Sequence, residues 1–243
     1  MTVPTGSFTD SVRALGAAGK SNRGAPLYSR FVNRPLGRVF AALAHQVGLT
    51  PNQVTGISAV FTFAGIAVLA TVPPSPVMSV GVVLLLVVGY ALDSADGQLA
   101  RLRGGGTAAG EWLDHVCDCL KAVSVHLAVL VSLYRFADVP EVFLLVPLLY
   151  APVDVLHFFA FIHTQSLRRP GGPALAVTDG ARPSVTRSVL SIPTDYGVLC
   201  VVFITIAWPT VFLPLYGVMF LGAAGYLVLA LPKWFRDVSR LPA

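Results

Sequence analysis

Four aspartates at regular spacing are the residues of this chain best suited to chemistry. Asp93 and Asp96 are three residues apart, and Asp114 and Asp118 are four apart. On an α-helix each of these spacings places both side chains on one face. Carboxylate oxygens in this number suit Mg²⁺ or Mn²⁺. The pattern predicts a divalent-metal site; protonated carboxyls, or acids merely exposed at a helix end, are the alternatives.

Small residues and an arginine lie among the acids. Gly97, Ala100 and Gly110 would let a ligand approach the backbone closely, although close packing between helices is an equal reason for small side chains. Arg101 would bind a phosphate or diphosphate through two hydrogen bonds, or anchor the helix end at a membrane surface. The group as a whole favours a site for a phosphorylated ligand.

The composition predicts a membrane protein. The 243 residues are 55% hydrophobic and only 12% charged, with a mean hydropathy of +0.72, whereas soluble domains carry about 25% charged residues. This length allows about six spans of roughly 20 residues. Interleaved basic and aromatic residues on a polar surface are absent from the sequence, which argues against nucleic-acid binding. Three cysteines without a CxxC motif argue against a zinc site or a disulfide framework.

The predicted fold is all-α, a polytopic membrane protein with six transmembrane helices preceded by an N-terminal amphipathic interfacial helix. Thr50-Pro51 is a helix-start signal, and three glycines at 104–106 predict a turn between the second and third spans. We expect a flexible cytoplasmic tail over 1–26, the amphipathic helix over 27–48, a six-helix catalytic domain over 49–237 and a cytoplasmic C-terminus over 238–243. The expected spans are 51–72, 77–102, 107–134, 141–166, and two within 196–232 divided by Pro209 and Pro214.

The basic residues predict the orientation. Of the 17 Lys and Arg, all but Lys121 and Arg135 fall on one side of the predicted topology. The positive-inside rule therefore places both termini in the cytoplasm, in a multi-pass protein of the cell membrane. The second span then ends, and the third begins, at the cytoplasmic face. The two aspartate pairs should lie at the same depth on antiparallel neighbouring helices.

A longer pattern contains these residues. Asp93-Ser-Ala-Asp96-Gly97-Gln-Leu-Ala100-Arg101 is followed by eight residues and Gly110, then three and Asp114, then three and Asp118. This pattern resembles the signature of the CDP-alcohol phosphotransferase family, also called CDP-alcohol phosphatidyltransferases. It covers 26 residues with eight matching positions, and the six-span layout extends the resemblance to most of the chain.

The resemblance implies roles for these positions. Asp93, Asp96 and Asp114 would be metal ligands, and Asp118 a ligand, the general base, or both. Gly97, Ala100 and Gly110 would let the cytidine nucleotide pack on the two helices, with Arg101 near its phosphates. Two Mg²⁺ or Mn²⁺ ions would clamp the diphosphate while a hydroxyl acceptor attacks and CMP leaves. The resemblance also implies a homodimer.

The donor and the acceptor stay open at this stage. A bacterial phosphatidyl transfer from CDP-diacylglycerol, in phospholipid biosynthesis, is the first hypothesis, because the chain is compact. The alternative is transfer of a CDP-headgroup to a lipid hydroxyl, because the residues around His115 resemble the choline/ethanolamine phosphotransferase version of the motif. Many bacterial phosphatidyl-transferring members have a basic residue after the fourth aspartate, but this chain has Cys119, with Lys121 two residues later on another helical face.

Further polar residues have two interpretations each. Asp154, His157 and His163 lie at helical spacing on the fourth span and would line an acceptor pocket or, as we favour, pack against the Arg-rich loop that follows. That loop, with Arg168, Arg169 and Arg187 among its residues, would bind an anionic acceptor or lipid phosphates, of which we favour the second.

Two other classes of protein compete with the enzyme. A cation or proton transporter would use the same carboxylates, but its acids belong nearer mid-membrane, often in inverted repeats, and it has no need for the small residues and Arg101. A noncatalytic membrane scaffold would leave the acidic cluster unexplained.

Overall fold

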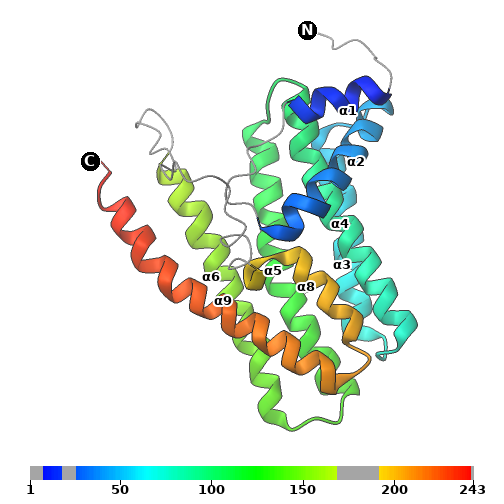
Figure 1. The fold of residues 1–243 in the computed structure, drawn as a ribbon, viewed down its shortest axis with the longest axis vertical. Helices are drawn as coiled ribbons and strands as arrows, with labels where there is room; N and C mark the ends of the chain where they lie inside the picture. The colour runs from blue at the N-terminus through cyan, green and yellow to red at the C-terminus, as the bar shows by residue number, and fades with distance from the viewer. Residues whose placement is uncertain (1–7, 18–25, 169–191, 242–243) are drawn as a thin grey trace.

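The computed structural model describes residues 8–17, 26–168 and 192–241 and contains helices and no strands over these ranges. The helical elements, drawn in Figure 1, are α1 (Phe8–Ala17), η1 (Ser29–Asn33), α2 (Arg34–Gln46), α3 (Pro51–Thr71), α4 (Pro76–Leu102), α5 (Ala108–Phe136), η2 (Glu141–Leu144), α6 (Leu145–Leu167), η3 (Ile192–Thr194), α8 (Tyr196–Val202), η4 (Phe203–Thr205) and α9 (Pro209–Val238).

Five described helices are long and apolar enough to cross a membrane: Pro51–Thr71, Pro76–Leu102, Ala108–Phe136, Glu141–Leu167 and Pro209–Val238. The prediction of an all-α, polytopic membrane protein is thus confirmed. The expected fifth span is shorter, an apolar stretch over Tyr196–Thr205. Pro209 begins α9, as its lack of an amide hydrogen favours, whereas Pro214 lies inside α9 and does not divide it.

The helix starts follow the sequence signals. Thr50 caps α3 in a capping box with Gln53: the Gln53 amide donates to Thr50 Oγ1 at 3.3 Å, and the Thr50 amide donates to Gln53 Oε1 at 2.8 Å. The Thr107 hydroxyl accepts from the Gly110 amide and caps α5. Gly104 and Gly105 have φ angles of +94° and +136°, so the predicted turn at 104–106 uses the left-handed backbone that glycine adopts without strain.

Helix α3 packs against both α4 and α5, more extensively than α4 and α5 pack against each other. Gly89 of α4 lies at the closest crossing: the Ser58 hydroxyl donates to its carbonyl at 2.8 Å, and a Cβ at Gly89 would collide with the Thr62 side chain. The side chains of the predicted second and third spans nevertheless meet at the aspartates, while each of these helices packs more extensively on α3. Helix α3 therefore packs on both predicted neighbours and helps to set their separation.

The N-terminal region differs in part from the expected flexible tail over 1–26. Residues 8–17 form α1, which packs on α2 and α4 (Figure 1). Leu15 is 2% exposed and joins a small core with Ala41, Ala42 and Leu99. Because Leu15 buries its side chain there, α1 has an apolar anchor that the polar composition of the segment hides.

Helix α2 has the two-sided character expected of residues 27–48. Gly37 and Ala41 are buried on the side packed against α4, while Leu36, Val39 and Leu43 are exposed. The start of this region is fixed to the far end of the chain, since the Tyr28 amide donates to Asp195 Oδ2 at 2.8 Å and a Cβ at Gly197 would overlap the Tyr28 ring. Burial raises the pKa of Asp195 above its ordinary value, partly offset by this hydrogen bond.

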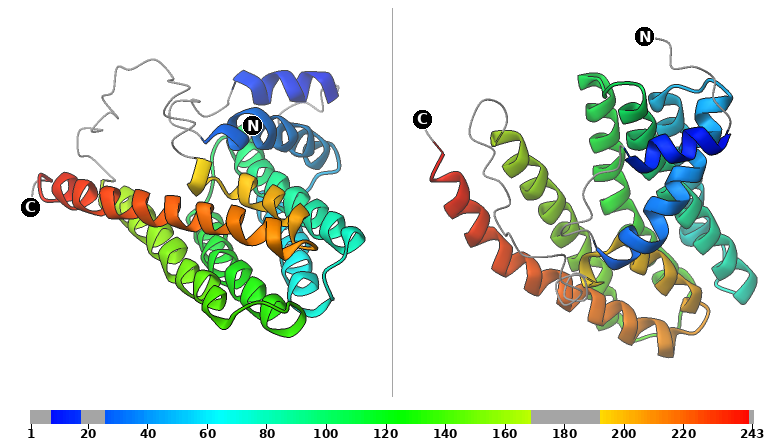
Figure 2. Two further views of the ribbon diagram at one scale, coloured as in Figure 1. Left: turned by 60° about the horizontal axis from the view of Figure 1, so that its bottom comes forward. Right: turned by 45° about the horizontal axis from the view of Figure 1, so that its top comes forward.

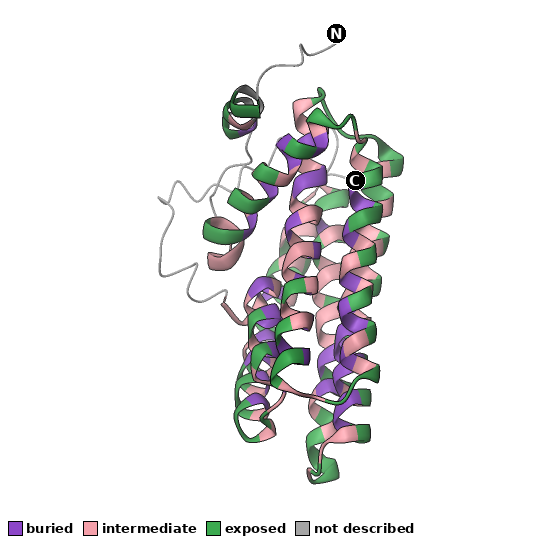
Figure 3. Ribbon diagram, turned by 90° about the vertical axis from the view of Figure 1, so that its right-hand side faces the viewer, coloured by how far each residue is buried: buried purple, intermediate pink, exposed green. Residues whose placement is uncertain are grey.

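A second packing unit joins α5, α6 and α9, whose C-terminal end lies on the opposite side of the molecule from α3 and α4 (Figures 1 and 2). His126 is fully buried, 2.6 Å from the Tyr216 hydroxyl and 3.4 Å from Asp154, and its ring stacks on Tyr150. Buried residues follow the inner faces of the long helices and exposed residues the outer faces (Figure 3).

Two glycine substitutions in α4 test the close α3–α4 crossing. Gly89→Ala should lower the free energy of unfolding by about 1–3 kcal/mol, because the new methyl group must displace α3. Gly81→Ala is the matched control, since its Cβ would meet nothing within 4 Å. Thermal unfolding in detergent micelles measures both. Equal stability of the two variants would show that the crossing has room to relax.

Candidate metal and nucleotide site

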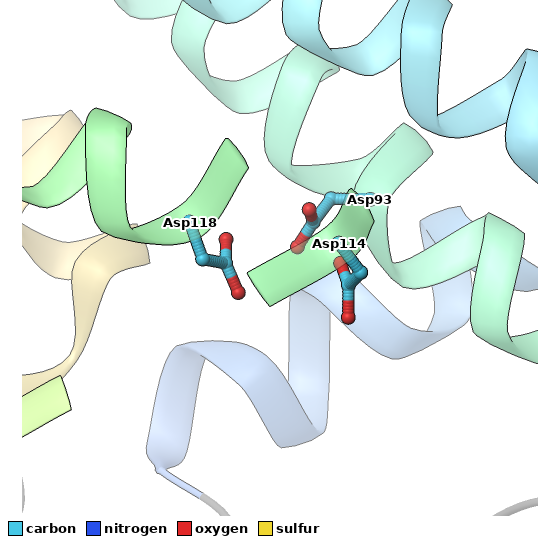
Figure 4. A group of neighbouring side chains, drawn as sticks. All are labelled: Asp93, Asp114 and Asp118. Atoms are coloured by element: carbon cyan, nitrogen blue, oxygen red, sulfur yellow. The ribbon is translucent and has the colours of Figure 1, made fainter. Parts of the chain in front are cut away.

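Three carboxylates from two helices converge in the structure. Asp93 of α4 and Asp114 and Asp118 of α5 each offer an oxygen, and these three oxygens lie within 4.8 Å of one another. Their side chains point toward a common space (Figure 4). All three residues are partly buried. Three like charges this close are stable only with cations or protons to neutralise them, and oxygen ligands suit a hard divalent ion.

The fourth aspartate is held differently. Asp96 is 6% exposed and accepts a hydrogen bond from Thr55 Oγ1 at 2.5 Å. Thr55 stands on α3, and its Oγ1 also lies 3.1 Å from the Pro51 carbonyl oxygen. Asp96 therefore lies outside the group of three, but it lines the same cleft as Asp93 and Asp114. Sequence reasoning missed Thr55, because nothing in the spacing showed that α3 would lie behind α4 at this point.

Lys121 is a cation in direct contact with the group. It forms an ion pair with Asp118, one helical turn earlier, and its Nζ lies 3.9 Å from Asp93 Oδ2. The spacing Asp118–Lys121 is the helical i, i+3 that brings side chains together. The sequence placed Lys121 on a different face of the helix from Cys119. In the structure Lys121 shares a face with Asp118.

A cleft of about 340 Å³ lies in front of the carboxylates. Asp93, Asp96 and Asp114 line one side of it, and α1, η1 and α2 provide the other. Four arginines line the cleft: Arg30, Arg34, Arg38 and Arg101. The first three were predicted only as part of the amphipathic helix over 27–48. Burial lowers the pKa of Arg34 from its ordinary value, yet a guanidinium remains charged at neutral pH. Cations facing carboxylates across one cleft suit a ligand that carries phosphate together with a divalent ion.

The predicted small residues divide between two roles. Gly97 lines the cleft, and a Cβ there would meet only Arg101 Nη1 at 3.5 Å. A Cβ at Gly110 would instead lie 2.8 Å from Asn52 Oδ1, so Gly110 permits close packing of α5 on the start of α3. Within the described part of the chain, neither Gly110 nor Ala100 lines the cleft. The structure therefore brings Gly97 and Arg101 together with the carboxylates, and keeps Ala100 and Gly110 beside them.

The histidines and the remaining acid of α5 and α6 lie elsewhere. His115 packs edge-on against Phe158, with ring centroids 6.2 Å apart, and His157 stacks on Trp234 at 5.8 Å. Asp154 pairs with His126 as described above. The contacts named here join helices to one another. Packing against the Arg-rich loop stays a prediction, because most of that loop lies outside the described residues.

The Arg-rich loop is described only at its start. Arg168 donates to Asp237 at 2.7 Å and so ties the end of α6 to α9. Arg169, Arg182 and Arg187 lie outside the described residues.

Removal of the Thr55 hydroxyl should weaken the fold around Asp96. Thr55→Val leaves a buried carboxyl oxygen without its donor, at a cost of about 1–3 kcal/mol in the free energy of unfolding. Ser58→Ala is the control on the same helix and should cost about 0.5–1.5 kcal/mol, because it removes a bond to a backbone carbonyl. Chemical denaturation in detergent compares them, and a smaller effect for Thr55→Val would contradict the assignment.

Metal binding should depend on the three converging carboxylates. Asp114→Asn should abolish the rise in melting temperature that Mn²⁺ or Mg²⁺ gives the unmodified protein, because one charged ligand is lost. Asp138→Asn, at an exposed position in the connector after α5, is the matched control and should keep it. An unchanged metal-induced shift in Asp114→Asn would remove Asp114 from the site.

Comparison with known proteins agrees with this geometry. Residues 48–231 match the family CDP-alcohol phosphatidyltransferase. The chain is 34% identical over 101 residues to the phosphatidylinositol phosphate synthase of Corynebacterium glutamicum, an alignment that covers 42% of this chain and 44% of that protein. It thus spans less than half the length of this curated relative.

Two crystal structures of the phosphatidylinositol phosphate synthase of Mycobacterium tuberculosis share the fold. The structure with manganese and citrate has a TM-score of 0.57 at 18% identity and covers 84% of this chain and 89% of its own. The structure with CDP-DAG bound has a TM-score of 0.55 at 21% identity and covers 87% and 96%. The region that matches the family contains the converging aspartates, Arg101 and the described long apolar helices up to most of α9. The chain therefore belongs to the CDP-alcohol phosphatidyltransferase family, whose members are transferases of substituted phosphate groups.

Proposed function

We propose that this protein transfers a phosphatidyl group from CDP-diacylglycerol to a hydroxyl acceptor, with release of CMP, in a reaction that requires a divalent metal. The observation that carries the proposal is a group of three carboxylates, two of which border an arginine-lined cleft of about 340 Å³ between the amphipathic N-terminal helices and the apolar helices. A diphosphate needs positive charge around it to depart as CMP. The cleft is the one place described where such charge adjoins metal-ligating oxygens.

The donor set fits Mg²⁺ or Mn²⁺, since all its atoms are carboxylate oxygens. Asp93, Asp114 and Asp118 would hold the metal, with Asp96 at the edge of the same cleft as a further ligand for a second ion. When bound, the metal neutralises charge on the diphosphate. Manganese bound to the mycobacterial relative supports this assignment.

The arginines and Gly97 would bind the nucleotide end of the donor. Arg101 follows the motif directly, and Arg30 and Arg34 face it from η1 and α2. Guanidinium groups make paired hydrogen bonds to phosphate. The space left by the missing side chain at Gly97 would admit the nucleotide against α4, in contact with Arg101.

Asp118 is the candidate general base. It belongs to the carboxylate group, and its ion pair with Lys121 fixes its side chain. A base must lie within hydrogen-bond reach of the acceptor hydroxyl. An acceptor bound beside the diphosphate would present its hydroxyl to Asp118, which would take the proton as the new phosphate ester forms.

The donor is chosen on two observations. CDP-DAG is bound to the mycobacterial protein of the same fold, and the corynebacterial relative is a phosphatidylinositol phosphate synthase. The headgroup-transfer alternative rested on the residues around His115, and His115 packs against Phe158 rather than lining the cleft. Family membership argues against the transporter and the scaffold.

The proposed orientation keeps the cytoplasmic side at the end of the bundle that holds the 104–106 turn. The predicted positions of the basic residues support it. The origin in a bacterium and the homodimer remain predictions, the first favoured by the corynebacterial relative.

Turnover should require Asp118. In purified protein reconstituted in lipid, Asp118→Asn should reduce release of CMP from CDP-diacylglycerol by at least about 10³-fold, as loss of both a ligand and a base predicts. Binding of the cytidine nucleotide should persist, because the arginines are intact. Asp138→Asn controls for the loss of an acidic side chain. Normal turnover in Asp118→Asn would reject the role of Asp118.

A panel of donors and acceptors tests the reaction itself. CDP-diacylglycerol is offered with small polyols and their phosphates, and CDP-choline and CDP-ethanolamine are offered with diacylglycerol, each with Mg²⁺ or Mn²⁺ and with a chelator. CMP release from CDP-diacylglycerol only when metal is present is the expected result. Release only from the CDP-headgroup donors would establish the alternative.

A further inference from the structure

In the proposed reaction Lys121 serves only through its ion pair with Asp118, although its contacts extend further. Its ammonium pairs with Asp118 and lies 3.9 Å from Asp93 Oδ2, so it touches both helices that supply the carboxylates. The Lys121 side chain is only 12% exposed. A long cationic side chain is rarely buried to this degree without partners that hold it.

Aromatic rings complete the surroundings of the ammonium. Lys121 Nζ lies 4.8 Å from the centre of the Tyr196 ring and 5.8 Å from that of Tyr90, and these two rings meet edge to face at 5.2 Å. The faces of aromatic rings attract cations at this range. We call the four residues Tyr90, Asp93, Asp118 and Tyr196 the ammonium box.

Lys121 lies behind Asp93 as seen from the nucleotide cleft. Lys121 borders a small hollow against α3, together with Thr55, Ser58 and Thr62, and is not among the residues that line the cleft. Asp93 borders both spaces. Lys121 can therefore act on the carboxylates from the rear while a donor and a metal ion occupy the front.

We propose that Lys121 is a positioning residue that acts through Asp93 and Asp118: a tethered cation whose charge limits how tightly the acidic cluster binds divalent metal. The inference rests on the proposed function, in which these carboxylates hold the metal. A fixed positive charge neutralises part of the carboxylate charge and repels a second cation. The ammonium box holds Lys121 in place, so its charge persists when a divalent ion arrives.

The effect of Lys121 has a defined sign. A residue that served only to stabilise the fold would lower metal affinity when removed, because the ligands would lose their arrangement. A tethered cation raises it when removed, because the carboxylates regain their full charge for the ion. The direction of the change in Mn²⁺ affinity distinguishes the two roles.

The experiment titrates Mn²⁺ into the full-length protein in detergent and measures unbound Mn²⁺ by electron paramagnetic resonance. Lys121→Met should bind Mn²⁺ at least tenfold more tightly than the unmodified protein, and its melting temperature should rise further when Mn²⁺ is added. Lys121→Arg restores the positive charge and should return the affinity to that of the unmodified protein. Unchanged or weaker Mn²⁺ binding by Lys121→Met would overturn the proposal.

A second pair of variants leaves Lys121 in place. Tyr196→Leu removes a ring face from the ammonium box and should tighten Mn²⁺ binding several-fold, whereas Tyr196→Phe keeps the ring and should leave it unchanged. Equal affinity of Tyr196→Leu and the unmodified protein contradicts the role of the box. If the unmodified protein binds no Mn²⁺, the metal site of the proposed function is itself rejected; if it binds and all variants bind equally, only the role of Lys121 is lost.

Discussion

Repulsion among carboxylates is the constraint on which the rest of this structure depends. Asp93, Asp114 and Asp118 hold oxygens within 4.8 Å of one another between helices apolar enough to cross a membrane. Charges this close repel far more strongly there than in water. Positive charges around the carboxylates reduce that repulsion. Lys121 lies on one side, the arginines of the cleft lie on the other, and the proposed divalent ions would bind between them.

The surrounding helices keep this arrangement from relaxing. Helix α3 packs against both α4 and α5 and crosses α4 at Gly89. Its Thr55 hydroxyl donates a hydrogen bond to Asp96. The arginines of α2 line the cleft. The segment that precedes α2 is held in place because the Tyr28 amide donates a hydrogen bond to Asp195, in the C-terminal half of the chain. Segments far apart in the sequence thus fix the two walls of the site.

Local patterns in the sequence predicted much of this arrangement. The spacing of Asp114 and Asp118, the capping signal at Thr50 and the glycine turn before α5 each depend on neighbours within a few residues, and each holds in the structure. What could not be predicted depends on packing between distant helices. Thr55 meets Asp96, Gly110 meets Asn52, and Leu15 anchors α1 only once α2, α3 and α4 are placed. The length of the helical stretch over Tyr196–Thr205 could not be predicted either, because the sequence stays apolar beyond the point where that stretch ends.

The position of the carboxylates along α4 and α5 bears on how a donor must arrive. Asp93 lies nine residues before the end of α4 and Asp118 ten residues after the start of α5, a descent of about 14–15 Å at 1.5 Å per residue. A water-soluble nucleotide would have to leave bulk solvent to travel that far down the bundle. A donor anchored by acyl chains would reach the same place from the side, so that lateral diffusion in the lipid would deliver it.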